Sequence, residues 1–194
     1  MAEVRKATTA DMPGLAAALA RAFEDDPVME WLFPKPAKRR RGAERMFGVR
    51  LRQLIGQDQV YTTEDRAGAA IWALPERWHV NTRETLELAR LVLNRRLPTL
   101  FSGLQRVDNA HPRHPAHFYL AVLGIDPPRQ GMGLGSALLA PVLQLCDSEG
   151  LPAYLESSKE RNVDFYARHG FRVTRELRLP KGPALWPMWR EPAP

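Results

Sequence analysis

The chain has 194 residues, the size of one domain, and its hydrophobic (44%) and charged (26%) fractions are close to the averages of globular proteins. These values exclude a disordered chain, a coiled coil and a collagen-like repeat, and no apolar run reaches the roughly 18 residues of a membrane span, so no membrane partner is expected. The 28 lysines and arginines against 22 aspartates and glutamates give a net charge of +6, which would suit nucleic acid, an acidic surface or a small polyanion.

The first part of the chain is predicted to form two helices and a hairpin. It begins without the apolar run of a signal peptide, so we expect a cytoplasmic protein. Thr8 and Asp11 form a capping-box pattern at the start of the first helix. The basic run Lys38–Arg41 has no aromatic residues between its charges and is predicted to be a solvated helix start, not a nucleic-acid site. The expected elements are a strand over 3–7, a helix ending near 25–27, a helix over 38–57, and hairpin strands over 60–63 and 69–74.

The second part begins with an arginine-rich insertion over about 82–110. Two stretches in it, 82–94 and 98–108, have helical spacing, and we expect two helices that cover a cleft. The apolar run Phe118–Ile125 predicts a central strand. Next come a glycine loop over 129–136, a helix through Cys146 kinked at Pro141, a strand over 152–157, a helix over 161–169, and strands over 171–179 and 185–190. Because there is no repeat and no linker, we predict a single domain over 1–194. Cys146 is the only cysteine, which excludes an intrachain disulfide.

The strongest chemical signal is the glycine loop between the apolar strand and the next helix. Glycines let a ligand approach the backbone, and a helix N-terminus offers free N–H groups and a positive dipole end, a combination that binds phosphate. A P-loop is excluded because no lysine follows Gly135. A dinucleotide fingerprint is disfavoured because Gly131, Gly133 and Gly135 alternate instead of following G-x-G-x-x-G. The spacing present is Q-x-x-G-x-G, starting at Gln130.

This loop and its flanking segments resemble the GNAT family of N-acetyltransferases. The segments that carry the resemblance are, in chain order, Leu123–Pro127, Gln130–Ser136, Leu155–Ser158, Asn162 and Phe165–Phe171. They are similar to the family's fourth strand, its pyrophosphate loop, and its fifth strand with the fourth helix. The resemblance implies an α/β fold in which a mixed, partly split sheet is flanked by helices on both faces, with 82–110 as a helical insertion.

Further segments are similar to the puromycin N-acetyltransferase subfamily. They are Arg5–Ala7, Ala70–Glu76, the interior Pro141, Gly150–Glu156, and Leu179–Pro183 with Trp186. The resemblance is to the subfamily and does not name that antibiotic as the acceptor. One residue departs from the family pattern: Met132 stands where the family often has lysine or arginine. This departure affects one charge-assisted contact to the pyrophosphate and leaves the backbone cradle in place.

The family resemblance implies acetyl-CoA as co-substrate, direct attack by an amine, and no metal. The residues expected to bind acetyl-CoA are Leu123, Ile125, Gln130, Gly131, Met132, Gly133, Gly135, Ser136 and Asn162. Pantetheine is expected to pair with the backbone of Leu123 and Ile125 like an added strand, and a backbone N–H near Leu123 to polarise the thioester carbonyl. Asn162 has the alternative of capping the next helix.

Two side chains are expected to move protons. Glu156 ends a strand beside the presumed thioester and is predicted to take a proton from the amine, with the alternative that it orients the acceptor. Tyr166 stands in the segment F-Y-x-x-x-G-F, where the resemblance implies a general acid for the leaving thiolate, with a packed tyrosine as the alternative.

The acceptor pocket is expected to draw on aromatic residues and a histidine, namely Trp31, Trp72, His117, Tyr119 and Trp186, although each could instead belong to the core. His111, His114 and His117 have a spacing that could suggest a metal site. This is disfavoured because Pro112 and Pro115 break the helix that would align them, and no cysteine or carboxylate joins them.

We therefore predict an acetyl-CoA-dependent N-acetyltransferase that acetylates the primary amine of a small molecule. It is expected to act as a monomer or homodimer, without a nucleic-acid partner. The alternatives are a peptide or protein N-terminal acetyltransferase, and a non-catalytic acyl-CoA sensor.

Overall fold

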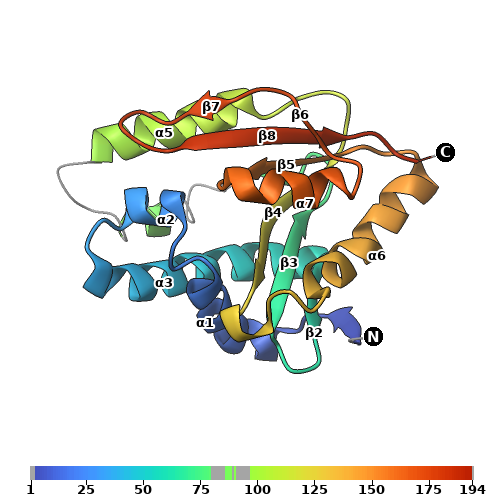
Figure 1. Ribbon diagram of the computed structural model, residues 1–194, viewed down its shortest axis with the longest axis horizontal. Helices are drawn as coiled ribbons and strands as arrows, with labels where there is room; N and C mark the ends of the chain where they lie inside the picture. Colours follow the sequence, from blue (N-terminus) through green and yellow to red (C-terminus); the bar gives the residue numbers. More distant parts are fainter. Residues whose placement is uncertain (1–2, 80–85, 89, 91–96, 194) are drawn as a thin grey trace.

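The computed structural model describes residues 3–79, 86–88, 90 and 97–193. Its centre is an eight-stranded sheet in the order β1-β2-β3-β4-β5-β8-β6, with β7 paired to the other part of β8 (Figure 1). All neighbouring strands are antiparallel except β4 and β5, which are parallel. The strands are β1 (Val4–Lys6), β2 (Val60–Thr63), β3 (Gly68–Ala73), β4 (Phe118–Ile125), β5 (Ala153–Ser157), β6 (Arg172–Val173), β7 (Leu177–Arg178) and β8 (Ala184–Arg190).

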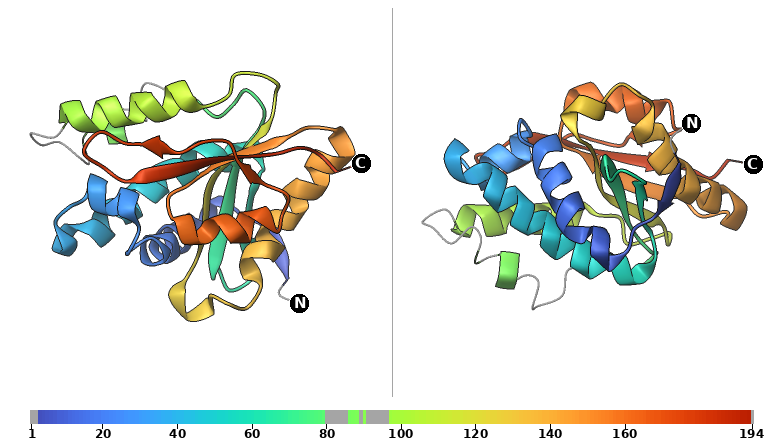
Figure 2. Two further views of the ribbon diagram at one scale, coloured as in Figure 1. Left: turned by 45° about the horizontal axis from the view of Figure 1, so that its top comes forward. Right: turned by 90° about the horizontal axis from the view of Figure 1, so that it is seen from below.

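Helices cover both faces of this sheet, as Figure 2 shows for α1 and α3 on one side and α6 on the other. The α-helices are α1 (Met12–Ala22), α2 (Pro27–Leu32), α3 (Pro36–Leu54), α5 (Leu97–Ala110), α6 (Leu134–Glu149) and α7 (Val163–Ala167). One buried cluster joins α1, α2, α3 and Leu100 of α5 to the sheet, and a second joins α6 and α7 to the opposite face. The expected α/β class with a mixed sheet and helices on both faces is confirmed. None of the helices in the described ranges is long and apolar enough to cross a bilayer.

The helices predicted within the described residues are present, and there is one addition. The segment after α1 forms a further helix, α2, that the sequence reading missed. Pro27 stands in its first turn, and the buried Asp26 caps it by accepting hydrogen bonds from the backbone N–H of Val28 (2.9 Å) and Met29 (3.1 Å). The expected helix over 98–108 is α5, with Pro98 in its first turn, where a proline costs no helical hydrogen bond. The expected helix over 82–94 lies largely outside the described residues.

The strand expected over 171–179 is instead two short strands, β6 and β7. The reason is Pro187 in β8, the strand with which both pair. The carbonyl of Pro187 accepts a hydrogen bond from Thr174 N–H (2.9 Å), so its backbone faces this neighbour, but a proline has no N–H to return. The ladder is therefore interrupted at this residue.

The feature of the fold that positions the site is the separation of β4 from β5. The two strands pair only over Phe118–Leu120 and Ala153–Leu155, so the second half of β4 has no partner on that side. The pairing of β4 with β3 also shifts by one residue: Trp72 opposes Leu120, but Ile71 opposes Val122. Ala121 is thus the extra residue of a β-bulge, which changes the faces to which later side chains point.

Candidate active site

A cleft of about 650 Å³ occupies the gap between the separated strands. Its walls come from the second half of β4, the glycine loop, the end of β5, the segment leading into α7, and the end of α1. The lining residues that matter for the chemistry are Leu123, Ile125, Gln130, Gly131, Gly133, Gly135, Ser136, Glu156, Asn162 and Tyr166. Predicted site residues from four separate segments therefore lie around one hollow.

The edge of β4 that faces this cleft has free backbone groups. Asp126 N–H donates to the carbonyl of Ala67 (2.8 Å), on the β3 side. Because backbone groups alternate along a strand, Gly124 faces β3 as well, whereas Leu123 and Ile125 face the cleft. The Ile125 carbonyl accepts a hydrogen bond from the side chain of Gln130 (2.9 Å), which ties the start of the glycine loop to this edge.

The glycine loop leads into the N-terminus of α6. Gly131 and Gly133 have φ angles of +76° and +78°, in the left-handed region, and a Cβ at either position would meet nothing within 4 Å. In the part of the chain that the structure describes, the N–H groups of residues 131–136 have no hydrogen-bond acceptor. The loop thus presents a row of free donors at the positive end of a sixteen-residue helix.

Side chains around the loop fix its shape. A Cβ added at Gly135 would lie 3.1 Å from the ring of Phe165, so α7 packs directly on the start of α6. The hydroxyl of Ser136 lies 2.9 Å from Nε2 of His169, which anchors this first turn. Met132 is exposed and does not line the cleft. The loop can therefore hold an anion through its backbone without help from the side chain at position 132.

Tyr166 lies in α7 with its ring buried in the core and only 8% of the residue exposed. Its hydroxyl has no hydrogen-bond partner among the described residues, and the residue lines the cleft. Burial, together with the negative charge of Asp26, raises the pKa of the Tyr166 hydroxyl well above its ordinary value. The hydroxyl therefore carries its proton at neutral pH and can donate it to a group in the cleft.

Glu156 is a carboxylic acid held in a nearly dry site. Its side chain is 7% exposed. Burial raises its pKa from an ordinary 4.5 to about 7, against the opposing effect of Tyr119, whose hydroxyl donates to Oε2 (2.8 Å). The neighbouring Tyr154 hydroxyl is buried and makes no well-formed hydrogen bond in the described structure. A pKa near 7 suits a group that exchanges a proton at physiological pH.

Two histidines lie beside this carboxyl group, and the sequence did not indicate that they form a pair. His111 and His117 are both buried, and their Nε2 atoms are 3.0 Å apart. His111 Nδ1 lies 3.8 Å from Oε1 of Glu156. The three-histidine pattern was the available signal, but it pointed only to a metal site and, for His117, to a place in the acceptor pocket. Across the described ranges, no group of three or more histidine, cysteine or acidic side chains is arranged to hold a metal ion.

The other predicted site residues lie partly in or beside the cleft and partly in the core. Asn162 precedes α7 and lines the cleft; its side chain makes no capping hydrogen bond, so capping does not account for it. Trp186 lies beside the cleft, as described below. Trp31 is buried against Gly103 and Gly182, and Trp72 is fully buried in the core on the α6 side. These two large rings serve packing and line neither hollow described here.

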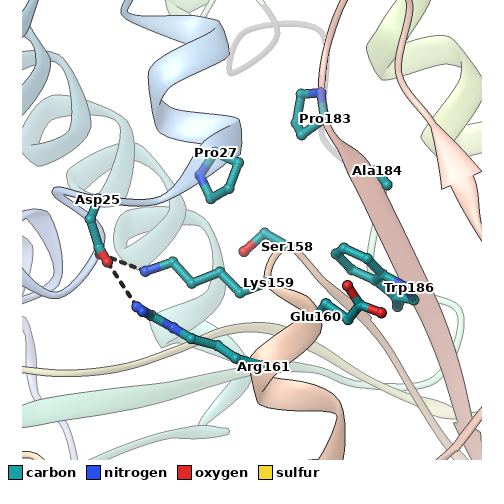
Figure 3. A pocket seen from close by; sticks show the side chains of 9 residues that line it. All are labelled: Asp25, Pro27, Ser158, Lys159, Glu160, Arg161, Pro183, Ala184 and Trp186. Carbon is teal, nitrogen blue, oxygen red and sulfur yellow. Dashed lines mark hydrogen bonds and ion pairs between the residues drawn. The ribbon is translucent and has the colours of Figure 1, made fainter.

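A second hollow of about 340 Å³ adjoins the cleft and shares Ser158, Lys159 and Arg161 with it (Figure 3). Asp25 bridges Lys159 and Arg161 through ion pairs. Trp186 and Glu160 line the hollow on the side away from Asp25. The hollow therefore combines an aromatic wall with charges of both signs. No residue of α5 lines it or the cleft, so the expected cover by the 82–110 insertion stays a prediction.

The chain is similar to known N-acetyltransferases in sequence and in fold. Residues 101–171 match the model of the Acetyltransferase (GNAT) family. The chain is 29% identical over 184 residues to an uncharacterized N-acetyltransferase of Schizosaccharomyces pombe, covering 87% of this chain and 74% of that protein. A crystal structure of histone acetyltransferase HPA2 and related acetyltransferase from Corynebacterium glutamicum superposes with a TM-score of 0.73 at 23% identity, covering 100% of this chain and 98% of the other. A crystal structure of an agmatine N-acetyltransferase superposes with a TM-score of 0.65 at 15% identity, covering 97% and 98%.

Proposed function

Since the chain belongs to the GNAT family of acetyl-CoA-dependent N-acetyltransferases, we propose that it acetylates the primary amine of a small molecule by direct attack in a ternary complex. The observation that carries the proposal is the cleft between β4 and β5. It has free backbone donors at one end and places Glu156 and Tyr166 along its walls.

The glycine loop and the edge of β4 are the proposed site for acetyl-CoA. The free N–H groups of residues 131–136 would hold its pyrophosphate. The open space beside Gly131 and Gly133 fits a bulky anion that must approach the backbone closely. Pantetheine would pair with the cleft-facing backbone of Leu123 and Ile125 as an added strand, which the separation of β5 from β4 leaves room for.

Glu156 is the proposed acceptor of the amine proton. An alkyl ammonium has a pKa of about 10.4, so at pH 7 roughly one molecule in 10³ is neutral. A carboxyl group with a pKa of about 7 can take up the proton as the amine nitrogen attacks the thioester carbon. The Tyr119 hydroxyl holds Oε2 in place through its 2.8 Å hydrogen bond.

Tyr166 is the proposed donor to the leaving group. When the carbon–sulfur bond breaks, the electron pair remains on sulfur, and the thiolate needs a proton. The Tyr166 hydroxyl carries one, lines the cleft, and has no other partner in the described structure. The free N–H groups on the edge of β4 would stabilise the negative oxygen of the tetrahedral intermediate.

The second hollow is the proposed site for the rest of the acceptor. The Trp186 ring and the Glu160 carboxylate, for which no ion pair is found in the described structure, suit an aromatic or cationic group. Solved structures with the same fold include an agmatine N-acetyltransferase and an arylalkylamine N-acetyltransferase, whose names specify acceptors of these kinds. This similarity supports a small-amine acceptor.

An acceptor screen tests the proposal. Release of CoA thiol would be followed with acetyl-CoA and a panel of agmatine, polyamines, arylalkylamines, puromycin and short peptides, using Tyr166→Phe as the matched control of reduced activity. We expect turnover with at least one small amine that exceeds turnover with the peptides. Turnover restricted to peptides would favour the N-terminal acetyltransferase, and acetyl-CoA binding without thiol release from any amine would favour the sensor.

A further inference from the structure

The buried histidine pair beside Glu156 has a defined arrangement of protons. The carbonyl of Pro115 can only accept, so His117 Nδ1, at 2.8 Å, must donate to it. In the neutral ring His117 Nε2 then has a lone pair and accepts from His111 Nε2–H, at 3.0 Å. His111 Nδ1 is consequently unprotonated, and it lies 3.8 Å from Glu156 Oε1, beyond the range of a hydrogen bond in the free protein.

The His111 ring is also fixed in position. It stacks on Trp78 with ring centroids 3.6 Å apart and a 19° angle between the planes. The rings of Tyr119 and Tyr154 contact it edge-on, with their centroids 4.8 Å and 4.7 Å from that of His111. Arg113 lies over the ring of Trp78, 5.0 Å from its centroid. A ring packed on these sides cannot turn away from the carboxyl group.

The charges around the pair keep His111 neutral. Burial is the main cause that lowers the pKa of His111, to about 3, and the positive charge of Arg113 acts in the same direction. Glu156 faces Tyr119 and Tyr154 from the sheet, and the charge of Arg50 in α3 also acts on it. The two oxygens of Glu156 therefore meet different partners: Oε2 receives a donor, whereas Oε1 faces an acceptor and has no hydrogen-bond partner in the described structure.

We propose that His111 is a positioning residue that presents the lone pair of Nδ1 to Glu156 and thereby holds on Oε1 the proton that Glu156 takes from the acceptor amine. The inference rests on the proposed function, in which Glu156 is the base. The step balances: the amine N–H bond breaks, the proton reaches the carboxylate directly or through a water molecule, and the carboxylate becomes a carboxylic acid that holds its hydrogen on Oε1, on the side of Nδ1. His117 acts only by fixing the tautomer of His111.

The effect of the histidine tautomers on Glu156 can be measured without substrate, by following the carboxyl ¹³C signal of Glu156 against pH by NMR. In His117→Phe the Nε2–H of His111 loses its acceptor, so the proton can move to Nδ1 and donate to Oε1, which stabilises the carboxylate. We expect the Glu156 pKa to fall by about one unit or more. His117→Gln keeps an acceptor and should restore a value near wild type. An unchanged Glu156 pKa in folded His117→Phe would overturn the proposal.

A double-mutant cycle tests the catalytic consequence. His111→Phe keeps the stack on Trp78 and removes the lone pair, and we expect kcat to fall about tenfold with the KM for acetyl-CoA unchanged. In the Glu156→Gln background the same change should have no further effect, whereas a purely structural role for His111 would give additive losses and sink the inference. The control is His79→Phe, because His79 is exposed and its ring also contacts Trp78, with ring centroids 3.8 Å apart. Wild-type kcat in Glu156→Gln alone would instead refute the base assignment of the proposed function.

Discussion

Glu156→Gln should stabilise the protein, and by an amount that depends on pH. The carboxyl group is 7% exposed, and its pKa in the folded state is raised from 4.5 to about 7. Below pH 4.5 the group is protonated in both the folded and the unfolded chain and costs nothing. Between pH 4.5 and 7 the unfolded chain ionises while the folded chain does not, so the folded state progressively loses stability as pH rises.

The magnitude follows from the difference between the two pKa values. A difference of about 2.5, from 4.5 to about 7, corresponds to about 3 kcal/mol at about 1.4 kcal/mol per pKa unit. Glutamine keeps the shape of the side chain and an acceptor for the Tyr119 hydroxyl but has no charge to bury. The variant should therefore exceed wild type in free energy of unfolding by about 3 kcal/mol above pH 7, relative to any difference at pH 4.5.

Urea unfolding of the two proteins at several pH values between 4.5 and 8 measures this effect. All other titrating groups are common to both proteins, so the difference between their unfolding free energies isolates Glu156. The difference should grow steadily up to about pH 7 and then level off. A difference that stays constant over the whole range would mean that the carboxyl group titrates alike in the folded and unfolded chains, and would refute the burial argument.

Three further outcomes are expected. Gly133→Asp places a negative charge in the glycine loop and should weaken acetyl-CoA binding, measured by calorimetry, at least tenfold, about 1.4 kcal/mol. The control is Gly150→Asp at the other end of α6, where the backbone is also in the left-handed region; it should leave acetyl-CoA binding unchanged. Tyr166→Phe should lower kcat by about 10²-fold and leave the affinity for acetyl-CoA unchanged. This loss is near the lower limit for a general acid, because a hydroxyl with a raised pKa is a weaker proton donor. A wild-type kcat in single-turnover measurements would remove Tyr166 from the mechanism. Leu100 is 1% exposed, and Leu100→Ala should lower the free energy of unfolding by about 2–4 kcal/mol, measured by thermal unfolding. Leu104 is 54% exposed, and Leu104→Ala should change this free energy little. The reverse order would show that the packed face of α5 is misassigned.

The parts of the site that could be predicted lie on short, continuous segments. The strand Phe118–Ile125 has the predicted bounds, and the glycine loop follows it. These features depend on local spacing: an apolar run, glycines at positions of positive φ, and a helix start directly after them. The assignment of Glu156 and Tyr166 rested on the same kind of local segment, and their roles stay predictions.

The parts that could not be predicted depend on contacts between distant segments. The bulge at Ala121 is a property of the register between β3 and β4, which no pattern within either strand specifies. His111 lies beside Glu156 although the segment after α5 and the end of β5 are far apart in the sequence. Trp72 was expected at a ligand pocket because it is aromatic, but burial is equally typical of such a ring, and the fold places it in the core.

The bulge at Ala121 also has a consequence for how the backbone of β4 exchanges its amide hydrogens with solvent. Beyond the bulge, alternate amides have different environments: that of Gly124 faces β3, whereas those of Leu123 and Ile125 face the cleft, where β5 has separated. In free protein the cleft-facing amides should exchange with deuterium faster than their neighbours. A molecule lying along this edge should slow exchange at every second residue. Exchange at the amides that face β3 would then measure the stability of the sheet, and exchange at the amides that face the cleft would measure its occupancy.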